Sequence, residues 1–420
     1  MKKLLLLTAL LATPASAQQV TRLPAQDKLL PGKPVMQFSI GAEDGEDWEL
    51  LSRVSQVAFD KEENLYVLDG GNHRVLVFNP QGRFIRKIGK QGGGPGELMT
   101  PVGLAVTSDG SIAVTDLGRP AVSLFKKDGT FIKNLTLGED FGFPVPTQGT
   151  YAHPRSGVIV RTMPPVMRRG GPEEIAPRTM TGRKSPLTWF ATDGKTSKLF
   201  DIPQPDITPR VQDSGAGQGQ RQVAVRIQVP AFTPATLWGV LPNGSVAVAS
   251  GANYRLQLAQ NGKIERVIER PFAPRKVTEA DKNREKARRR EQMASGRGNM
   301  IMATREQAGS GPARGSTSVG GAMNRQQIDQ MLAELTFAET IPVLAGLYVD
   351  PRGRMWVQRT GREVGRDGPI DLLDAAGRYV GTLNGQKLPA AVSLSGRAAY
   401  IERDDMDVEK VVVRKLPANW

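Results

Sequence analysis

The chain has 420 residues and no cysteine, and it carries 56 Lys and Arg against 42 Asp and Glu, a formal net charge of +14. The absence of thiols excludes disulfides, cysteine metal ligands and a lipid-modified N-terminal cysteine, so the core alone must hold the fold. The basic balance favours anionic partners such as polysaccharide, nucleic acid or an acidic membrane surface, although net charge bears on solubility and non-specific binding rather than on a site.

The first residues have the pattern of a secretory signal peptide. Lys2 and Lys3 form a basic region, residues 4–12 are apolar, and Ala15-Ser16-Ala17 is a small-residue cleavage signal. We therefore predict residues 1–17 as a signal peptide cut after Ala17, which makes the mature chain a secreted or periplasmic bacterial protein and not a lipoprotein. Loss of Lys2 and Lys3 lowers the net charge from +14 to +12. The apolar stretch is too short to span a bilayer, and no later segment qualifies; an uncleaved membrane anchor is the alternative.

An internal repeat predicts the fold. Residues 54–90 contain four short strands separated by turns, and residues 101–138 repeat the pattern, with Ala58 and Ala105 equivalent at a spacing of 47 residues. Propeller blades have a period of roughly 40–50 residues. Weaker copies occupy about residues 148–203, 235–271, 342–385 and 388–416. The six copies predict an all-β fold, a six-bladed β-propeller formed by residues 18–420.

The last copy supplies only three strands, and a segment before the first copy can complete it. Residues 35–41 (VMQFSIG) have strand-like alternation. We expect this N-terminal strand to pair with the strand around residues 411–413 and close the ring, because closure removes two exposed sheet edges.

The predicted turns repeat as consistently as the strands, and each contains a glycine that can supply the positive φ of a tight hairpin. The turns between the first two strands contain Gly110, Gly244, Gly353 and Gly396, and those between the last two contain Gly82, Gly129, Gly194, Gly262 and Gly377.

Two regions lie outside the repeat. Residues 163–186 and 204–229 are rich in Pro, Gly, Arg and Gln and are predicted as long excursions from blade three. Residues 275–337 form a basic helical or disordered insertion between blades four and five. Within it we predict a charged helix over residues 278–293 capped by Thr278, disorder over residues 295–321, and a second helix over residues 324–335. The apolar face of the second helix contains Ile328, Met331, Leu332 and Leu335.

Asn72, His73 and Arg74 open the third strand of the first copy, and the stretch GGGPGEL (residues 92–98) follows its fourth strand. Both features resemble the NHL-repeat family of β-propellers, and exported bacterial six-bladed propellers look like the nearest relatives. The resemblance is specific for blade one, fair for blade two and only geometric for the others. It implies the fold but not the activity. The family contains protein-binding, RNA-binding and sensor modules, and one branch carries a metal-dependent lyase.

The loops between second and third strands share one end of the ring with the links between blades. Ring-shaped β folds often bind ligands at such a mouth. The residues that we predict to bind a ligand there are Arg53, Asn72, His73, Arg119, Arg161, Arg255, Arg359, Arg362 and Arg403. Because most are basic, an anionic ligand fits better than a cationic one; the alternative is that they are ordinary solvated loop residues.

No catalytic constellation is predicted. His73 and His153 are the only histidines and are expected at opposite ends of the ring, so a three-histidine zinc site is excluded. This departs from the lyase branch, which relies on several histidines. Asp69 and Asp116 end second strands, where aspartates commonly cap turns; a Ca²⁺ ion held by both and by backbone carbonyls is the alternative. No other cofactor is expected.

The sequence therefore predicts a secreted or periplasmic binding or interaction module whose ligand is a protein or an anionic polymer. Export makes nucleic acid an unfavoured partner. The alternative function is a divalent-metal-dependent hydrolase or lyase that acts on a sugar or lactone through the central tunnel.

Overall fold

The computed structural model of the chain describes residues 19–119, 121–136, 143–144, 149–163, 181–206, 208–217, 220–294, 301–306, 314–319 and 324–420. The predicted signal peptide, residues 1–17, lies outside the described residues, as do residues 164–180 of the first predicted excursion. Neither helix among the described residues has both the length and the apolar character needed to cross a bilayer.

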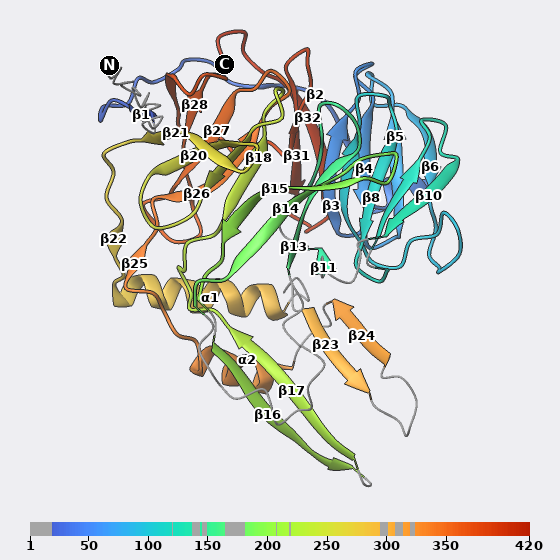
Figure 1. The fold of residues 1–420 in the computed structure, drawn as a ribbon, viewed down its shortest axis with the longest axis vertical. Coiled ribbons are helices and arrows are strands. Elements are labelled where there is room, and N and C mark those ends of the chain that lie inside the picture. The colour runs from blue at the N-terminus through green and yellow to red at the C-terminus, as the bar shows by residue number, and fades with distance from the viewer. Residues whose placement is uncertain are drawn as a thin grey trace, which may run out of the picture.

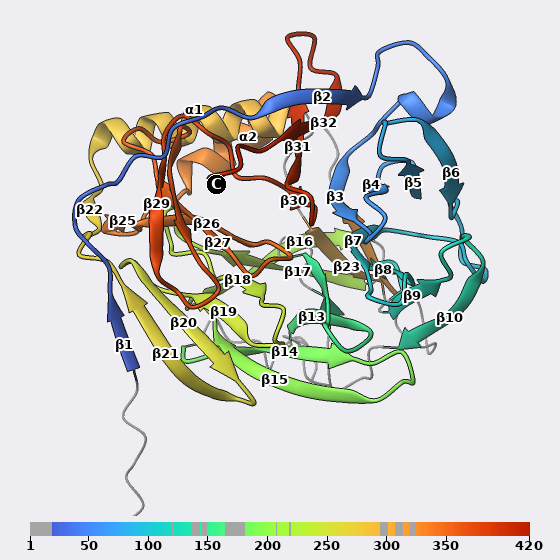
Figure 2. The ribbon, with the colours of Figure 1, turned by 90° about the horizontal axis from the view of Figure 1, so that it is seen from above.

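Six sheets surround a central axis, and each is built on four antiparallel strands, which are consecutive in sequence in blades one to five (Figures 1 and 2). Blade one consists of β3 (Val54–Phe59), β4 (Leu65–Asp69), β5 (Arg74–Phe78) and β6 (Phe84–Ile88). Blade two consists of β7 (Pro101–Val106), β8 (Ile112–Asp116), β9 (Ala121–Phe125) and β10 (Phe131–Thr136). Blade three consists of β12 (Thr150–Ala152), β13 (Val158–Met163), β14 (Lys184–Phe190) and β15 (Thr196–Pro203), with β11 (Phe143–Pro144) paired to β13.

The other half of the ring has the same organisation, except that the last blade borrows a strand. Blade four consists of β18 (Leu237–Val240), β19 (Val246–Ala249), β20 (Arg255–Gln260) and β21 (Lys263–Glu269). Blade five consists of β26 (Leu344–Val349), β27 (Met355–Thr360), β28 (Asp367–Leu373) and β29 (Tyr379–Leu383). Blade six consists of β30 (Ala391–Val392), β31 (Arg397–Arg403), β32 (Glu409–Lys415) and the early strand β2 (Val35–Ile40).

The predicted ring closure is confirmed. β2 pairs antiparallel with β32, with Phe38 opposite Val413 and Ile40 opposite Val411. The fold is the predicted six-bladed β-propeller, in which an N-terminal strand completes the last blade.

The middle strands are buried on both faces because each blade is covered by two neighbours. All five residues of β4, β5, β8 and β9 are buried. One core cluster joins Leu68 and Val77 of blade one to Leu104 and Phe125 of blade two. Burial on both faces is the reason that these strands are continuous apolar runs rather than alternating ones.

The turns are also repeated. The nine glycines predicted in hairpin turns all have positive φ, between 78° and 96°. In blade one, Glu63 occupies the corresponding position of the first turn with φ 67°. Its carboxylate accepts hydrogen bonds from the backbone N–H and the hydroxyl of Ser395 in blade six, at 2.9 and 2.7 Å. Contacts across the ring closure therefore offset a backbone conformation that glutamate rarely adopts.

A segment that we call the N-terminal clasp, residues 19–41, crosses the outer edges of blades four, five and six. β1 (Gln19–Arg22) adds a parallel fifth strand beside β21, a pairing that the sequence analysis did not predict. Further along, the backbone N–H of Thr382 in β29 donates to the carbonyl of Lys28 at 2.8 Å. β2 then joins blade six, and the short 3-10 helix η1 (Asp47–Glu49) leads into β3. The clasp thus connects three blades that are far from it in sequence.

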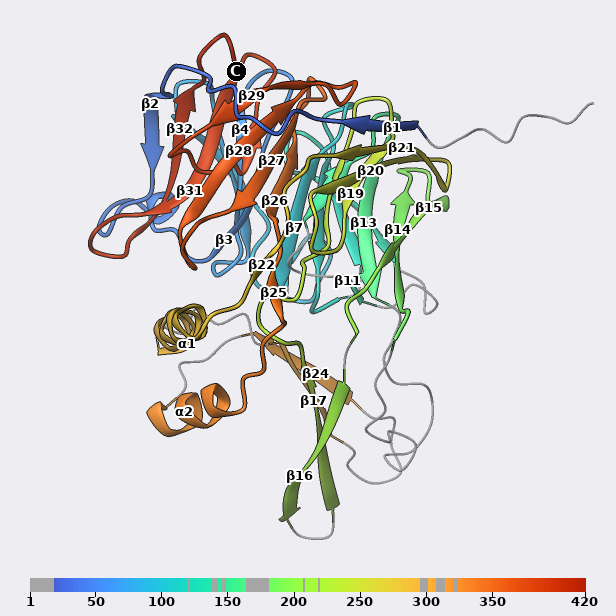
Figure 3. The same cartoon turned by 90° about the vertical axis from the view of Figure 1, so that its left-hand side faces the viewer.

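Two insertions emerge from the same end of the ring, which we call the insertion end (Figures 1 and 3). The loops between second and third strands also lie there, whereas the remaining turns lie at the opposite turn end. The link from β15 to β18 carries the hairpin β16 (Thr208–Gly217) and β17 (Gln220–Gln228). The link from β21 to β26 carries β22 (Arg275–Lys276), α1 (Glu279–Ala294), β23 (Ile301–Glu306), β24 (Arg314–Val319), α2 (Arg325–Ala333) and β25 (Thr340–Ile341).

The second insertion follows the prediction in its helices and differs from it between them. Thr278 caps α1: its Oγ1 accepts from the backbone N–H of Asp281 at 3.3 Å. Ile328 and Leu332 on the predicted apolar face of α2 are buried. Of residues 295–321, which were expected to be disordered, the structure describes residues 301–306 and 314–319, which pair as the antiparallel strands β23 and β24; the rest of the stretch lies outside the described residues. A two-stranded ladder is held by backbone hydrogen bonds and needs little apolar burial, so composition alone did not indicate it.

Candidate functional site: the central cavity and its surroundings

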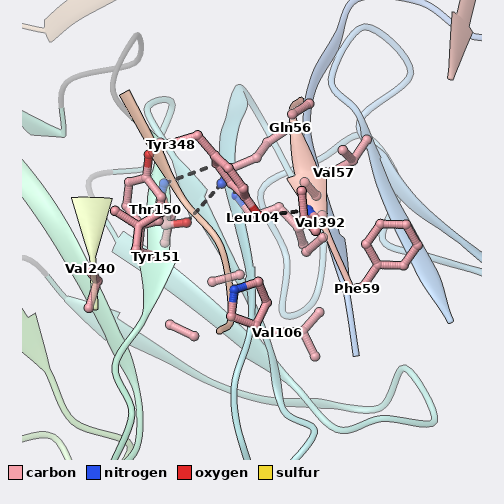
Figure 4. A pocket seen from close by; sticks show the side chains of 18 of the residues that line it. Gln56, Val57, Phe59, Leu104, Val106, Thr150, Tyr151, Val240, Tyr348 and Val392 are labelled. Atoms are coloured by element: carbon pink, nitrogen blue, oxygen red, sulfur yellow. Dashed lines mark hydrogen bonds between the residues drawn. The ribbon is translucent and has the colours of Figure 1, made fainter. Parts of the chain in front are cut away.

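The first strands of the six blades, β3, β7, β12, β18, β26 and β30, enclose a central cavity of about 1060 Å³ (Figure 4). The cavity extends from Arg53 and Pro101 near the insertion end to Asp60 and His153 at the turn end. Concave sites of about this size commonly bind small molecules. The apolar side chains of the wall are Val57, Phe59, Leu104, Val106, Tyr151, Trp238, Val240, Leu347, Tyr348, Val349 and Val392.

Gln56 of β3 links three blades inside this cavity (Figure 4). Its Oε1 accepts hydrogen bonds from the backbone N–H groups of Leu104 in blade two at 3.0 Å and of Thr150 in blade three at 3.2 Å. Its Nε2 donates to the carbonyl of Thr150 at 2.9 Å. The first strand of a blade has an unpaired edge toward the axis, so the Gln56 amide satisfies backbone groups that would otherwise lack a protein partner. These contacts give Gln56 a structural role.

Two tyrosines bring hydrogen-bond donors to the cavity, and a buried tryptophan packs behind one of them. Tyr348 accepts from the backbone N–H of Val392 at 2.8 Å, which leaves its own O–H free to donate. Tyr151 packs edge-on against Trp238, with ring centroids 4.6 Å apart. Trp238 is 3% exposed, and its Nε1 has no hydrogen-bond partner among the described residues.

Burial keeps both tyrosines protonated. It raises the pKa of Tyr151 to about 12 and raises the pKa of Tyr348 well above its ordinary value. Both phenols are therefore neutral at physiological pH and can donate as well as accept hydrogen bonds.

The ionisable side chains at the turn end are engaged in turns. Asp60 accepts from the backbone N–H and the side-chain Nδ2 of Asn64, both at 2.8 Å. Asp350 accepts from Arg354 Nε at 3.0 Å. His153 Nδ1 accepts from the backbone N–H of Arg155 at 3.2 Å, and burial lowers the pKa of His153, so it is neutral at pH 7. All three side chains stabilise the turns that follow first strands.

Of the nine residues predicted to bind a ligand at the mouth, Arg53 alone lines the central cavity. Its Nη2 donates to the carbonyl of Gly70 at 3.2 Å. Arg362 is exposed in the loop between β27 and β28. Three others have partners: Arg119 donates to the carbonyl of Gly93 at 2.6 Å, Arg255 pairs with Glu269 at 3.5 Å, and Arg403 pairs with Glu409 at 3.1 Å.

Arg161 and Arg359 were expected at an open mouth, but Arg161 is buried within blade three and Arg359 is only partly exposed beside the N-terminal clasp. Arg161 is 5% exposed and donates to Ser185 Oγ at 3.2 Å and to Gln204 Oε1. Burial lowers the pKa of Arg161 to about 10. The Arg359 side chain is 11% exposed and pairs with Asp27 of the N-terminal clasp at 2.7 Å. Both belong to second strands, which neighbouring blades cover on both faces, so they stabilise the ring.

The NHL-like tripeptide closes the loop from β4 to β5. Asp69 Oδ2 accepts from Asn72 Nδ2 and from Arg74 Nε, both at 2.8 Å. Asp69 Oδ1 accepts from the backbone N–H of Ser52 at 2.8 Å. His73 has φ 55°, and its buried Nδ1 lacks a partner among the described residues. The Asn72-His73-Arg74 motif therefore belongs to a local network that ties the entry of blade one to its second strand.

Asp116 repeats this arrangement in blade two. Its oxygens accept from the backbone N–H groups of Met99 at 2.7 Å, Thr100 at 2.7 Å and Gly118 at 2.9 Å. These contacts support the turn-capping role for Asp69 and Asp116, while the Ca²⁺ alternative stays a prediction. Within the described ranges, no group of three or more His, Cys, Asp or Glu side chains is arranged to hold a metal ion.

Sequence reasoning missed the residues that line the cavity, Gln56, Tyr151, Trp238 and Tyr348. All four belong to the first strand of a repeat. Once the repeat is recognised, the first strand of each copy is the innermost one, and its polar or aromatic side chains are candidates for the axis. The loop residues from which a mouth site was predicted lie outside these strands.

Comparison with known proteins agrees with the fold. A family model for a 6-bladed β-propeller matches residues 45–150. The human E3 ubiquitin-protein ligase NHLRC1 is 27% identical over 100 residues, which are 24% of this chain and 24% of that protein. The match thus spans about a quarter of that relative.

Solved structures resemble the chain over most of its length. A Bacteroides fragilis protein whose name describes it as exported is 11% identical, with TM-score 0.47 over 95% of this chain and 99% of that chain. Virginiamycin B lyase from Staphylococcus aureus, in a catalytically inactive form, is 12% identical, with TM-score 0.39 over 87% of this chain and 97% of that chain. The assignment of a six-bladed β-propeller rests on the six sheets of this chain and on the family-model match.

Proposed function

We propose that this chain is an exported, non-catalytic binding module that engages an anionic polymer through the insertion end of its propeller. The observation that carries this proposal is a group of exposed cations at that end. Arg284 of α1, Arg325 of α2 and Arg362 of the β27–β28 loop are exposed and form no ion pair with a described residue. A basic surface of this kind attracts polyanions at long range.

The three side chains are held on a common support. The backbone carbonyl of Arg362 accepts from Arg275 Nη2 at 3.3 Å, and Arg275 in turn pairs with Asp281 of α1 at 2.6 Å. Arg290 of α1 pairs with Asp329 of α2 at 2.7 Å. These contacts join α1 to α2 and to the β27–β28 loop. Because the three elements are already held together, less conformational entropy of the protein is lost when a polymer binds.

The expected result of neutralising this surface is weaker polymer binding. The triple variant Arg284→Gln, Arg325→Gln and Arg362→Gln should bind heparin, used as the polyanion, about tenfold less tightly at physiological salt, since exposed ion pairs contribute up to ~1 kcal/mol each. Wild-type affinity should fall steeply as salt rises, because the Debye length is only about 8 Å at physiological ionic strength. Titration calorimetry at several salt concentrations measures both effects.

A matched control removes the same charge from the turn end. Arg83, Lys126 and Lys263 are exposed in turns between third and fourth strands, and they form no ion pair within the described part of the chain. The triple variant Arg83→Gln, Lys126→Gln and Lys263→Gln should retain most of the heparin affinity. If the two triple variants lost the same heparin affinity, binding would depend only on the net charge of the protein. That result would contradict a specific binding surface at the insertion end. Arg359, one of the residues first expected at the mouth, is unsuitable for this test because it is paired and only partly exposed.

Export is tested separately from binding. When the whole sequence is expressed in a bacterial host, we expect a protein in the periplasm or medium whose N-terminus is Gln18, because Ala15 and Ala17 supply the small residues of a cleavage site. The Ala17→Leu variant should accumulate as an uncut precursor. N-terminal sequencing measures the cut, and a wild-type cytoplasmic protein that still begins at Met1 would refute export.

A further inference from the structure

The central cavity has a chemistry that the proposed polymer-binding surface does not use. Its charged residues lie at the two ends: Arg53, Asp60 and Asp350 hydrogen-bond to the protein itself, and the exposed Lys61 at the turn end lies 4.0 Å from Glu62. Between these ends the wall consists largely of Val, Leu and aromatic side chains. Water gains few hydrogen bonds in an apolar space, so a hydrocarbon that displaces it binds favourably.

The dimensions of the cavity favour a long, thin occupant. β3 and β26, two of the six strands around the cavity, each contain six residues. At about 3.3 Å per residue such strands span roughly 20 Å, the length of an extended acyl chain of about 16 carbons. The enclosed volume of about 1060 Å³ is ample for such a chain.

Two phenol donors on the wall have no acceptor among the described residues. Tyr348 uses its oxygen as an acceptor for Val392 N–H, and no described group accepts from its own O–H. Tyr151 lies beside Trp238 and receives no hydrogen bond from the described residues. A buried donor without an acceptor costs free energy, and a carbonyl oxygen of a ligand would relieve that cost.

We propose that the central cavity binds a neutral long-chain acyl ester, with its hydrocarbon chain along the axis and its carbonyl oxygen at the phenol donors of Tyr151 and Tyr348. The aliphatic wall selects the chain, the donors select the ester group, and the lack of a free charge in the interior disfavours an ionised carboxylate. This site is independent of the insertion end.

The test uses methyl laurate as the ester probe. Dodecane, an alkane of the same chain length without a carbonyl, is the control ligand. Equilibrium dialysis with radiolabelled methyl laurate should show saturable binding at one site that does not change with salt. The Tyr151→Phe variant keeps the ring but loses the donor, so its ester affinity should fall roughly threefold to tenfold while dodecane binding is unchanged. Salt independence separates this result from polymer binding.

A second pair of variants tests the location without relying on a hydrogen bond. Val240, a half-buried wall residue (Figure 4), can be replaced by Phe to fill space while the wall remains apolar. Val240→Phe should weaken methyl palmitate at least tenfold and methyl octanoate much less. Ile132→Phe, on the outer strand of blade two, is the matched control and should change neither. Absence of saturable binding to the wild type, equal behaviour of the two variants, or an unchanged ester preference in Tyr151→Phe would overturn the proposal.

Discussion

A chain that begins at Ala42, and so lacks the N-terminal clasp, is expected to lose at least about 5 kcal/mol in free energy of unfolding. Blade six would keep three strands, and the outer edges of β21 and β32 would be exposed. Leu23 and Ile40, which are 6% and 3% exposed, would leave the core, and each such burial contributes about 1.5–3 kcal/mol. Trp420 Nε1 would also lose its hydrogen bond to the carbonyl of Pro31, which is 2.9 Å long.

Urea unfolding of two truncated chains measures this effect. A chain that begins at Leu23 lacks only β1. Its urea midpoint should be close to that of the chain that begins at Gln18, because blade four retains its own four strands. The chain that begins at Ala42 should unfold at much lower urea and aggregate through its open edges. If the Ala42 chain unfolded at the same midpoint as the Leu23 chain, the closure by β2 would not stabilise the ring.

Replacement of Arg270 by Met is expected to destabilise the protein by about 3–5 kcal/mol, the usual cost of leaving one member of a buried ion pair without its partner. The Arg270 side chain is fully buried and pairs with the fully buried Asp371 at 2.8 Å and with Asp27 of the clasp at 2.8 Å. Without Arg270, the remaining cation near Asp371 is Arg359, whose Nη2 lies 3.5 Å away. The buried carboxylate of Asp371 would then have only this more distant guanidinium to balance its charge.

This network joins three parts of the molecule that are distant in sequence. The guanidinium groups of Arg270 and Arg359 both pack against the ring of Phe272, at 4.8 and 4.6 Å from its centroid. Arg270 Nε also donates to the carbonyl of Pro24 in the clasp at 2.7 Å. Blade four, blade five and the clasp therefore share one buried charged cluster, and the substitution should loosen all three.

The control for Arg270→Met is an exposed ion pair. Lys195 and Asp193 lie 3.1 Å apart with side chains that are 85% and 55% exposed, so Lys195→Met should change stability by less than ~1 kcal/mol. Thermal and urea unfolding of both variants give the comparison. If the two variants were equally stable, the Arg270 cluster would not stabilise the ring.

The same cluster predicts a pH dependence through Asp27. Burial opposes ionisation of Asp27, but hydrogen bonds and charges from Arg359 and Arg270 prevail and lower its pKa from 3.8. A lowered pKa in the folded state stabilises the protein above the unfolded value, and this contribution is lost as the pH falls through the folded value. The stability difference between wild type and Asp27→Asn should therefore be constant near neutral pH and shrink below pH 3.8.

Much of the fold could be predicted from local patterns because each blade repeats them. The spacing of Ala58 and Ala105 and the glycines of the hairpin turns indicated six blades, and the missing strand of the last copy indicated closure by residues 35–41. Thr278 and the apolar face of α2 likewise predicted helices in the insertion. Each of these signals depends on neighbours within a few residues or on a count of copies, and both are visible without three-dimensional structure.

The cavity, the clasp and the accessibility of the arginines depended on tertiary structure. β1 pairs with β21, which is more than half of the chain away in sequence, and the four residues QVTR carry no local pattern that specifies such a partner. Arg359 and Arg362 are three residues apart with similar composition around them, yet one pairs with Asp27 and Asp371 and is only partly exposed, whereas the other is exposed. The sequence by itself determined that the chain forms a closed ring of repeated blades, because repetition and turn chemistry are local. Only the packing of blades against one another decided which side chains face the axis, which charges pair, and where space remains for a ligand.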